Sequence, residues 1–249
     1  MWIGSIKSLI GVTVCILLLS SATAQNAARS VNGPLTSTAD SLRALGIDLS
    51  ESSLIAALRN GNPEIRSLAA LQLAGDHDFD AILPIEDALS IEANTRSRIG
   101  MAQALWSLHD PKGVASLQEL CSTVALPIDD LVEVVQSLNN LNESSGTCAA
   151  PIFEYLDSHN DSESRLRVLP AVPDLYRWVP RDQTERIVRE LRNMLVDSDG
   201  AVRMQASDGI VQIGLRSAGD ALRAAIAQEQ NPDIRSHLQR SMDRLEKTQ

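Results

Sequence analysis

The chain has 249 residues and a formal net charge of −10 at pH 7, so it is long enough for a buried core and too acidic for the basic surface that binds duplex nucleic acid. Apolar residues make up 44% of the sequence but aromatic residues only 3%, which predicts a core of aliphatic side chains. With 22% charged residues the chain is not a polar disordered polymer, and no nucleic-acid partner is expected.

The first 24 residues are predicted to be an export signal. Lys7 precedes an apolar run at residues 9–19, and small residues follow as far as Ala24. A basic residue, a short apolar run and a small-x-small site are typical of a secretory signal peptide, which predicts cleavage after Ala24. The alternative is an uncleaved N-terminal anchor. We expect the protein to contact a membrane only in that case, through the anchor. We therefore expect a periplasmic or secreted protein.

An internal repeat of about 32 residues organises the rest of the chain. Residues 62–66 read NPEIR and residues 231–235 read NPDIR. The shared frame, in which an Asn or Asp precedes an Arg by four positions, recurs at Asn62 and Arg66, Asn94 and Arg98, Asp161 and Arg165, Asp199 and Arg203, and Asn231 and Arg235. A degenerate copy at residues 126–130 reads LPIDD, with Asp130 in place of the arginine. The spacing therefore predicts six units.

Each unit is predicted to be a hairpin of two helices. The Asn or Asp of the frame is suited to cap the second helix, whose small and aliphatic residues after the arginine share one face. An apolar first helix precedes each frame, at residues 54–58, 82–89, 114–120, 152–156, 187–195 and 222–226. One such hairpin cannot bury its own apolar face, so the hairpins must stack on a continuous core.

With these frames, and with links such as WSLHDPKG at residues 106–113, the chain resembles HEAT-repeat proteins of the phycobilin-lyase-like bacterial subtype. The resemblance implies an all-α fold, an armadillo-like α-solenoid in which about six stacked hairpins form a right-handed superhelix. It covers residues 51–246, after a linker and N-terminal capping helix in residues 25–50 and before a frayed tail at residues 247–249. It is weakest in the third and fourth units, where Asp130 and three prolines interrupt the pattern.

The row of frame arginines has two interpretations. In the structural one, each arginine binds a capping Asn or Asp of its own or the neighbouring unit and fixes how the repeats stack. In the functional one, the row binds anions. We favour the structural interpretation, because the spacing of the arginines coincides with the period of the fold.

Two His-Asp pairs, at residues 77–78 and 109–110, occupy equivalent links of successive units. Imidazoles and carboxylates bind metals, but a repeat duplicates its links and these lie roughly 10 Å apart, so no metal site is expected. Deoxyhypusine hydroxylase, a HEAT-like enzyme, uses His-Glu pairs, and this chain contains none. His159 and His237 are interpreted as ordinary surface residues. Because the sequence also lacks a Gly-x-Ser-x-Gly elbow and a glycine-rich phosphate loop, we expect no catalytic residue, no cofactor and no enzymatic activity.

Cys121 and Cys148 are the two cysteines outside the predicted signal. An exported location permits a disulfide between them, and closing this loop would stabilise the fold by about 3 kcal/mol. The alternative is a pair of buried thiols.

A first candidate for partner binding is the concave face, which the second helices of HEAT-like solenoids usually line. Positions one and five residues after the frame arginine are predicted to point outward. Several of these positions are apolar, which predicts a groove for a peptide or helix formed by Ile99, Leu131, Val135, Leu166 and Met204. The alternative is that supercoiling buries these positions against adjacent helices.

A second candidate is the basic segment at residues 165–192. Trp178, Arg186 and Arg189 combine an aromatic side chain with arginines, which is the usual composition of an interaction hot spot. The alternative is a solvated face on which arginine stems cover Trp178.

These observations predict a monomeric, non-enzymatic protein–protein interaction module, a scaffold of the bacterial cell envelope or secreted fraction that binds a protein or peptide on its concave face. Two alternatives stay open, because one fold serves many functions. They are a chromophore- or metal-handling HEAT-type enzyme of the lyase-like kind, and a purely structural spacer.

Overall fold

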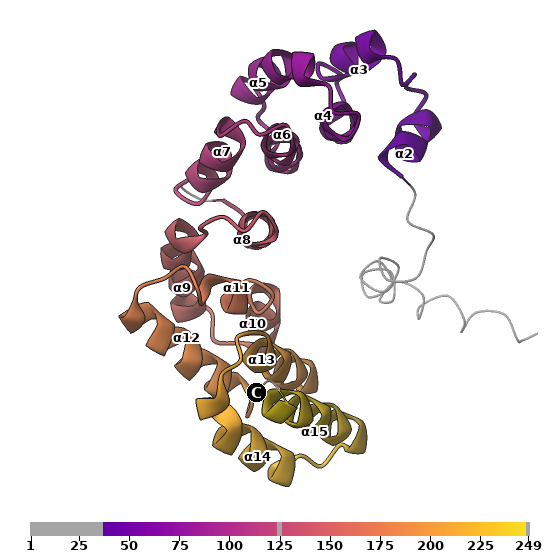
Figure 1. Cartoon of the computed structure of the whole chain (residues 1–249). Coiled ribbons are helices and arrows are strands. Elements are labelled where there is room, and N and C mark those ends of the chain that lie inside the picture. The colour runs from indigo at the N-terminus through magenta and orange to yellow at the C-terminus, as the bar shows by residue number, and fades with distance from the viewer. Residues whose placement is uncertain (1–36, 124–125, 248–249) are drawn as a thin grey trace, which may run out of the picture.

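The computed structural model describes residues 37–123 and 126–247, and every regular element in those ranges is a helix (Figure 1). The predicted export signal and its cleavage site after Ala24 lie outside the described residues. The first described helix, α2 (Thr38–Ala44), stands where the N-terminal capping helix is expected. Among the helices in the described ranges, none is both long enough and apolar enough to span a bilayer.

Six helical hairpins follow α2 in the described part of the chain. Each joins a first helix to a second: α3 (Glu51–Ala57) to α4 (Pro63–Gly75), α5 (Ile82–Ser90) to α6 (Thr95–Ser107), α7 (Lys112–Leu120) to α8 (Ile128–Asn140), α9 (Ala149–Ser158) to α10 (Ser162–Val168), α12 (Arg181–Met194) to α13 (Gly200–Gln212), and α14 (Gly219–Gln228) to α15 (Pro232–Lys247). Short helices occupy links: η1 (Phe79–Ala81), η2 (Gly146–Cys148), α11 (Val172–Leu175) and η3 (Arg216–Ala218).

The hairpins stack side by side into a curved array. In Figure 1 the second helices α4, α6, α8, α13 and α15 form the inner row of the arc, and the first helices α5, α7, α12 and α14 form the outer row. Successive second helices contact each other, most extensively α4 with α6 and α13 with α15. This arrangement confirms the predicted α-solenoid of stacked hairpins.

The C-terminal boundary differs slightly from the prediction. Helix α15 continues through Lys247, which the sequence pattern assigned to a frayed tail. A basic residue in the last turn of a helix interacts favourably with the helix dipole, which helps to keep Lys247 helical. Residues 248–249 lie outside the described residues.

The polar residue of the repeat frame starts the second helix. Its side-chain oxygen accepts a hydrogen bond of 2.7–3.0 Å from a backbone amide in the first turn, in the units of Asn62, Asn94, Asp161, Asp199 and Asn231. Such bonds satisfy amides that have no partner within a helix. In the degenerate third unit the frame position is Leu126, and Pro127, which directly precedes α8, makes no side-chain cap.

The repeated His-Asp pairs are explained by how the helices end. A left-handed residue follows five of the described helices, at Gly46, His77, His109, Asn142 and Gly214. His77 has φ 56° and His109 has φ 65°, and the amides of Asp78 and Asp110 return to carbonyls in the last helical turn at 3.1 and 2.9 Å. The carboxylates of Asp78 and Asp110 then accept backbone amides of the next element, at 3.1 and 2.8 Å. Each pair therefore ends one helix and starts the next.

The core is aliphatic and elongated rather than centred on one point. Its two clusters meet in α6, where Met101 and Leu105 pack with the first hairpins and Ile99 packs with the later ones. Small residues let successive second helices approach closely: a Cβ on Gly100 would lie 1.9 Å from Ser67 Oγ.

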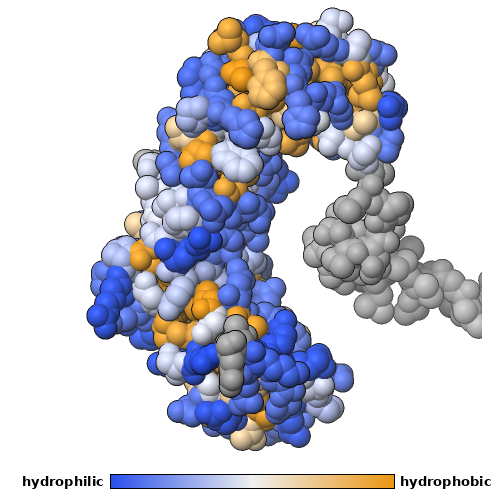
Figure 2. Space-filling model, in the orientation of Figure 1, coloured by the Kyte–Doolittle hydropathy of each residue, from blue (hydrophilic) through white to orange (hydrophobic). Residues whose placement is uncertain are grey.

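This close approach makes the predicted apolar groove wrong for the middle units. Ile99, Leu131 and Val135 are at most 3% exposed, and Leu166 and Met204 are partly buried. Positions one and five after the frame arginine lie between neighbouring second helices, because those helices pack directly on one another. On the face shown in Figure 2, hydrophobic residues lie in separate groups among hydrophilic ones.

Candidate functional site

Four of the five frame arginines bind carboxylates, but not those of the capping residues, and Arg235 donates to the backbone carbonyl of Glu229. The capping oxygens already accept backbone amides, and three of the arginines instead reach a carboxylate two residues before the next cap. We call these contacts the inter-repeat ion pairs: Arg66–Glu92 at 2.6 Å, Arg165–Asp197, and Arg203–Glu229 at 2.6 Å. The prediction that the row is structural therefore agrees with these contacts, whereas the predicted acceptor was wrong.

The carboxylates of the inter-repeat ion pairs also hold the start of the next second helix. Their side chains are at most 5% exposed, and each accepts the backbone amide of the following capping residue at 2.8 or 2.9 Å. Ser97 adds a hydrogen bond of 2.7 Å to Glu92, and Ser162 adds one of 2.5 Å to Asp197. All donor nitrogens of Arg66 and Arg203 are used within the array, and Arg165 donates to Asp197, so these three arginines do not form an open row for anions.

These buried carboxylates are ionised because their hydrogen bonds outweigh their burial. Burial by itself disfavours the charged form of Glu92, but hydrogen bonds from Arg66, Ser97 and a backbone amide lower the pKa of Glu92 to about 2. Burial is likewise outweighed at Asp197, where hydrogen bonds from Ser162 and other donors hold the pKa below its usual value. At Glu229 a backbone amide is the main cause of the lowered pKa.

The second-to-third and third-to-fourth junctions lack an inter-repeat ion pair among the residues described. Arg98 reaches only Glu119, which is 72% exposed, at 3.4 Å, and the Nε atom of Arg98 is buried without a partner in the same ranges. At the third-to-fourth junction, Cys121 and Cys148 form a disulfide with their Cα atoms 4.6 Å apart. The disulfide joins the end of α7 to the η2 turn before α9.

The third unit has carboxylates, and no frame arginine, at its contacts with the neighbouring second helices. Asp130, which replaces the frame arginine, faces Arg96 of the second unit at 3.6 Å. Its neighbour Asp129 pairs with Arg167 of the fourth unit at 2.6 Å. These two contacts run between second helices and are more exposed than the inter-repeat ion pairs.

The predicted basic surface at residues 165–192 is largely paired within the protein. Arg186 lies 4.4 Å from the Phe153 ring and pairs with an aspartate of α9 at 2.5 Å. The guanidinium of Arg177 lies 4.6 Å from the ring centre of Trp178, which is partly buried. Arg189 is exposed. These contacts favour the alternative of a solvated face, and of the three predicted residues Arg189 alone is exposed to solvent.

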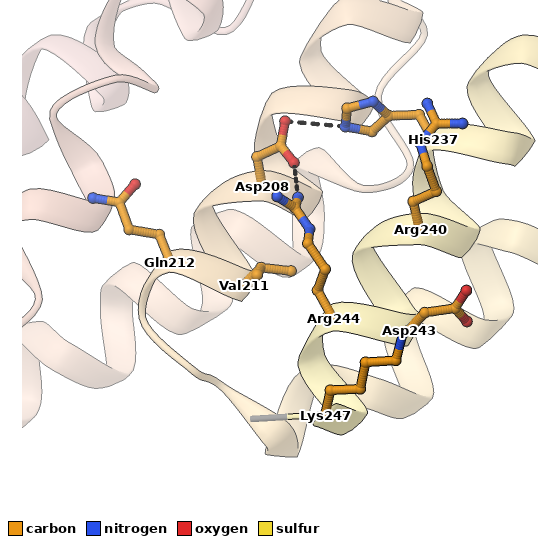
Figure 3. Close-up of a pocket in the computed structure, with 8 residues that line it drawn as sticks. All are labelled: Asp208, Val211, Gln212, His237, Arg240, Asp243, Arg244 and Lys247. Carbon is orange, nitrogen blue, oxygen red and sulfur yellow. Dashed lines mark hydrogen bonds and ion pairs between the residues drawn. The ribbon is translucent and has the colours of Figure 1, made fainter. Parts of the chain in front are cut away.

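An open depression of about 790 Å³ lies between α13 and α15, at the C-terminal end of the inner row (Figure 3). Side chains from both helices line it: Asp208, Val211 and Gln212 from α13, and His237, Arg240, Asp243, Arg244 and Lys247 from α15. The four basic residues of α15 that line the depression recur every three or four positions and therefore share one face of the helix. On this face Arg240 is exposed to solvent, whereas Val135, at the same position of the third unit, is buried.

One carboxylate fixes two of the basic side chains. Asp208 pairs with Arg244 at 2.5 Å and with His237 Nε2 at 3.0 Å (Figure 3). Behind it, the hydroxyls of Ser207 and Ser241 are hydrogen-bonded at 3.1 Å and fully buried. These contacts tie α13 to α15 and hold one wall of the depression.

Gln212 is held by a second buried carboxylate. Asp174 of α11 is 8% exposed and accepts hydrogen bonds from the side-chain amides of Gln212 at 2.6 Å and Asn139 at 2.9 Å. Burial is the main cause that raises the pKa of Asp174, and the hydrogen bond from Gln212 opposes it. The network joins α8, α11 and α13 and orients the α13 side of the depression.

The remaining two cations have no carboxylate partner within the described ranges. Arg240 donates a hydrogen bond to the Ser236 hydroxyl at 2.8 Å, and Lys247 makes no ion pair there. The nearby Asp243 accepts the side-chain amide of Gln239 at 2.9 Å. Two positive charges at this end of the inner row are therefore available to a ligand.

The sequence contains a pattern that points to this site, but we assigned its residues to the repeat frame or to the ordinary surface. His237 was interpreted as an ordinary surface residue, and Asp208 and Arg240 stood at the position five residues after the frame arginine. The spacing of the basic residues from His237 to Lys247 identifies one helical face, but not that this face is open. Among the residues described, no three His, Cys, Asp or Glu side chains are grouped so that they would hold a metal ion.

Comparisons with known proteins find similar solved structures but no related sequence. No protein-family model matches the chain, and no curated protein sequence matches it. Similar solved structures include a designed armadillo repeat protein, with 13% identity over 79% of this chain and 100% of that chain and a TM-score of 0.40. The complex of CpcE and CpcF of phycocyanin lyase from Nostoc sp. PCC7120 has 19% identity, 80% and 95% coverage, and a TM-score of 0.38. Human deoxyhypusine hydroxylase in complex with glycerol has 16% identity, 90% and 89% coverage, and a TM-score of 0.38.

At these identities and TM-scores the likeness carries no inference about activity or partner. The fold rests on the helices themselves, which alternate between an inner and an outer row. The chain has an armadillo- and HEAT-like repeat fold, whereas the phycobilin-lyase-like subtype stays a prediction.

Proposed function

We propose that the protein is a non-enzymatic interaction module that binds a protein or peptide on its concave face, as a scaffold of the bacterial cell envelope or secreted fraction. The observation that carries this proposal is the open depression between α13 and α15, where Arg240 and Lys247 have no carboxylate partner in the described ranges. The side chains of Arg240 and Lys247 are exposed to solvent, so they are available to a partner.

The architecture supports this proposal because stacked hairpins present an extended surface. Each repeat contacts mainly its neighbours, so the shape of the array is set at the junctions. The inter-repeat ion pairs hold three of those junctions and the disulfide holds a fourth. A surface that is already ordered loses less conformational entropy when it binds a partner.

Site-directed crosslinking in intact cells tests the proposal. A photoreactive residue replaces Ser236, one helical turn from Arg240, and a control replaces Arg181, whose side chain is 93% exposed on α12 of the outer row. We expect one protein to be recovered in stoichiometric yield from position 236 and not from position 181, as identified by mass spectrometry. Equal recovery at both positions, or none, would contradict binding on the concave face.

Two further measurements address the rest of the proposal. Cell fractionation of the full chain should find it in the envelope or the medium, and its recovery from the cytosol would contradict the location. Purified protein should contain no stoichiometric pigment or metal by absorption and elemental analysis. Finding either would favour the lyase-like enzyme instead.

A further inference from the structure

We infer that the partner is acidic: the depression between α13 and α15 binds a polypeptide segment with two carboxylates about 10 Å apart, one on Arg240 and one on Lys247. The inference rests on the proposed function for the place of binding, and adds the chemistry of the partner.

The spacing of the two cations defines the spacing of the carboxylates. Arg240 and Lys247 are seven residues apart on α15, which is two helical turns, or about 10 Å at 1.5 Å per residue. Figure 3 shows Arg240, Arg244 and Lys247 following one another along α15 where it faces the depression. In an extended polypeptide three residues also span about 10 Å, so acidic residues three positions apart match the two cations.

The charges in the depression select for a negative ligand. Three Lys or Arg side chains line it against two Asp side chains, in a chain whose net charge is −10. Arg244 and His237 are held by Asp208, so they are positioned without being free to move away. A positively charged segment would bind more favourably to the acidic surface elsewhere on this protein. A carboxylate binds more favourably in this depression.

The chemistry of the side chains favours carboxylates on a polypeptide. The planar guanidinium of Arg240 presents paired donors that match a carboxylate, and Lys247 supplies a second point charge. Val211 lines the same depression and offers aliphatic contact to the backbone or side chains of a peptide. Nucleic acid requires many phosphate contacts, which two unpaired cations in an acidic chain do not supply.

Fluorescence anisotropy with the full chain tests the inference. The probe is a fluorescein-labelled peptide of sequence AEAAEAAEA, in which glutamates recur every third residue, and its control has glutamine at those positions. We expect the acidic peptide to bind about tenfold more tightly than the glutamine peptide, as two partly exposed ion pairs allow.

Paired variants assign the binding to this site. Arg240→Gln with Lys247→Gln should weaken binding of the acidic peptide about tenfold. The matched control is Arg59→Gln with Arg181→Gln, which removes the same charge from two exposed residues, one in the link after α3 and one at the start of α12, and should leave the affinity unchanged. Both side chains of the test pair are exposed, so the helical circular dichroism signal should be retained.

The outcomes separate this inference from the proposed function. Equal affinity of the two double variants, or failure of the acidic peptide to bind, would overturn the acidic site, even where crosslinking at position 236 still recovers a partner. A single-stranded oligonucleotide that binds as tightly as the acidic peptide would overturn the assignment to a polypeptide. Peptide binding without any crosslinked partner in cells would contradict the proposed function alone.

Discussion

The junctions between repeats are held in two different ways. The first-to-second, fourth-to-fifth and fifth-to-sixth junctions each contain an arginine bound to a buried carboxylate that also caps the next link. The two middle junctions have exposed or longer ion pairs among the described residues, and one of them has the disulfide. A stacked array depends on every junction, because its repeats are stabilised by their neighbours. At the third-to-fourth junction, where the frame arginine is missing, the disulfide joins the neighbouring repeats instead.

The third unit keeps its apolar packing although its polar frame is missing. In α8 the side chains of Val134, Val135 and Leu138 are fully buried, although that helix lacks a capping residue. Asp130 and Pro127 account for the loss of the arginine and of the cap. Buried apolar side chains and the disulfide therefore stabilise a unit whose polar frame is missing.

The largest effect is expected from breaking an inter-repeat ion pair. Glu92→Ala should lower the free energy of unfolding by about 4 kcal/mol, because Arg66, Ser97 and the amide of Asn94 lose their common acceptor. Urea denaturation followed by circular dichroism measures this. The control is Glu119→Ala at a middle junction, where the partner is exposed and a change of less than about 0.5 kcal/mol is expected. Similar losses in both variants would remove the distinction between the two kinds of junction.

Removing the disulfide is expected to have the next largest effect. Cys121→Ser with Cys148→Ser should cost about 3 kcal/mol, since the unfolded chain regains the entropy of an open loop. Hydrogen exchange should increase in α7, η2 and α9 more than in α13 and α15. Uniform exchange, or a loss below about 1 kcal/mol, would show that apolar packing alone holds the middle junction.

Acid should weaken the ion-paired junctions selectively. The pKa of Glu92 is lowered from 4.5 in the unfolded chain to about 2 in the folded protein. The ionised carboxylate therefore contributes its full share to the free energy of unfolding above the unfolded pKa, and this share is lost as the pH falls from about 5 towards 2. The loss is on the order of 2–3 kcal/mol. Stability measured against pH should fall less steeply over this interval in Glu92→Gln. A variant curve parallel to that of the wild type would exclude Glu92 as a source of the acid sensitivity.

The smallest effects are expected at the left-handed links, which lie outside the ion pairs. His109→Gly, at the second-to-third junction, should stabilise the protein by about 0.5–1 kcal/mol, because glycine adopts a positive φ without strain. Gly214→Ala, at the fifth-to-sixth junction, should destabilise it by about 1 kcal/mol for the converse reason. Thermal melts measure both. A loss of stability in His109→Gly would mean that the imidazole makes a contact that outweighs the backbone strain.

Much of the local structure follows from the sequence because it depends on residues close together in the chain. Helix caps such as Asn62 and Asp199, the hairpin order and the six-unit period were all predictable from spacing. The structural reading of the arginines also followed from their period. Their acceptors did not, because Glu92 lies 26 residues from Arg66 and only stacking brings the two side chains together.

The tertiary structure alone decided which positions are buried and which stay open. Ile99 and Leu131 were expected to face a groove, but close packing of successive second helices covers them. Equivalent positions in the last repeat, such as Ser236 and Arg240, are exposed. A periodic sequence therefore determined the repeating unit, whereas the packing of the helices in space determined which side chains stay accessible to a partner.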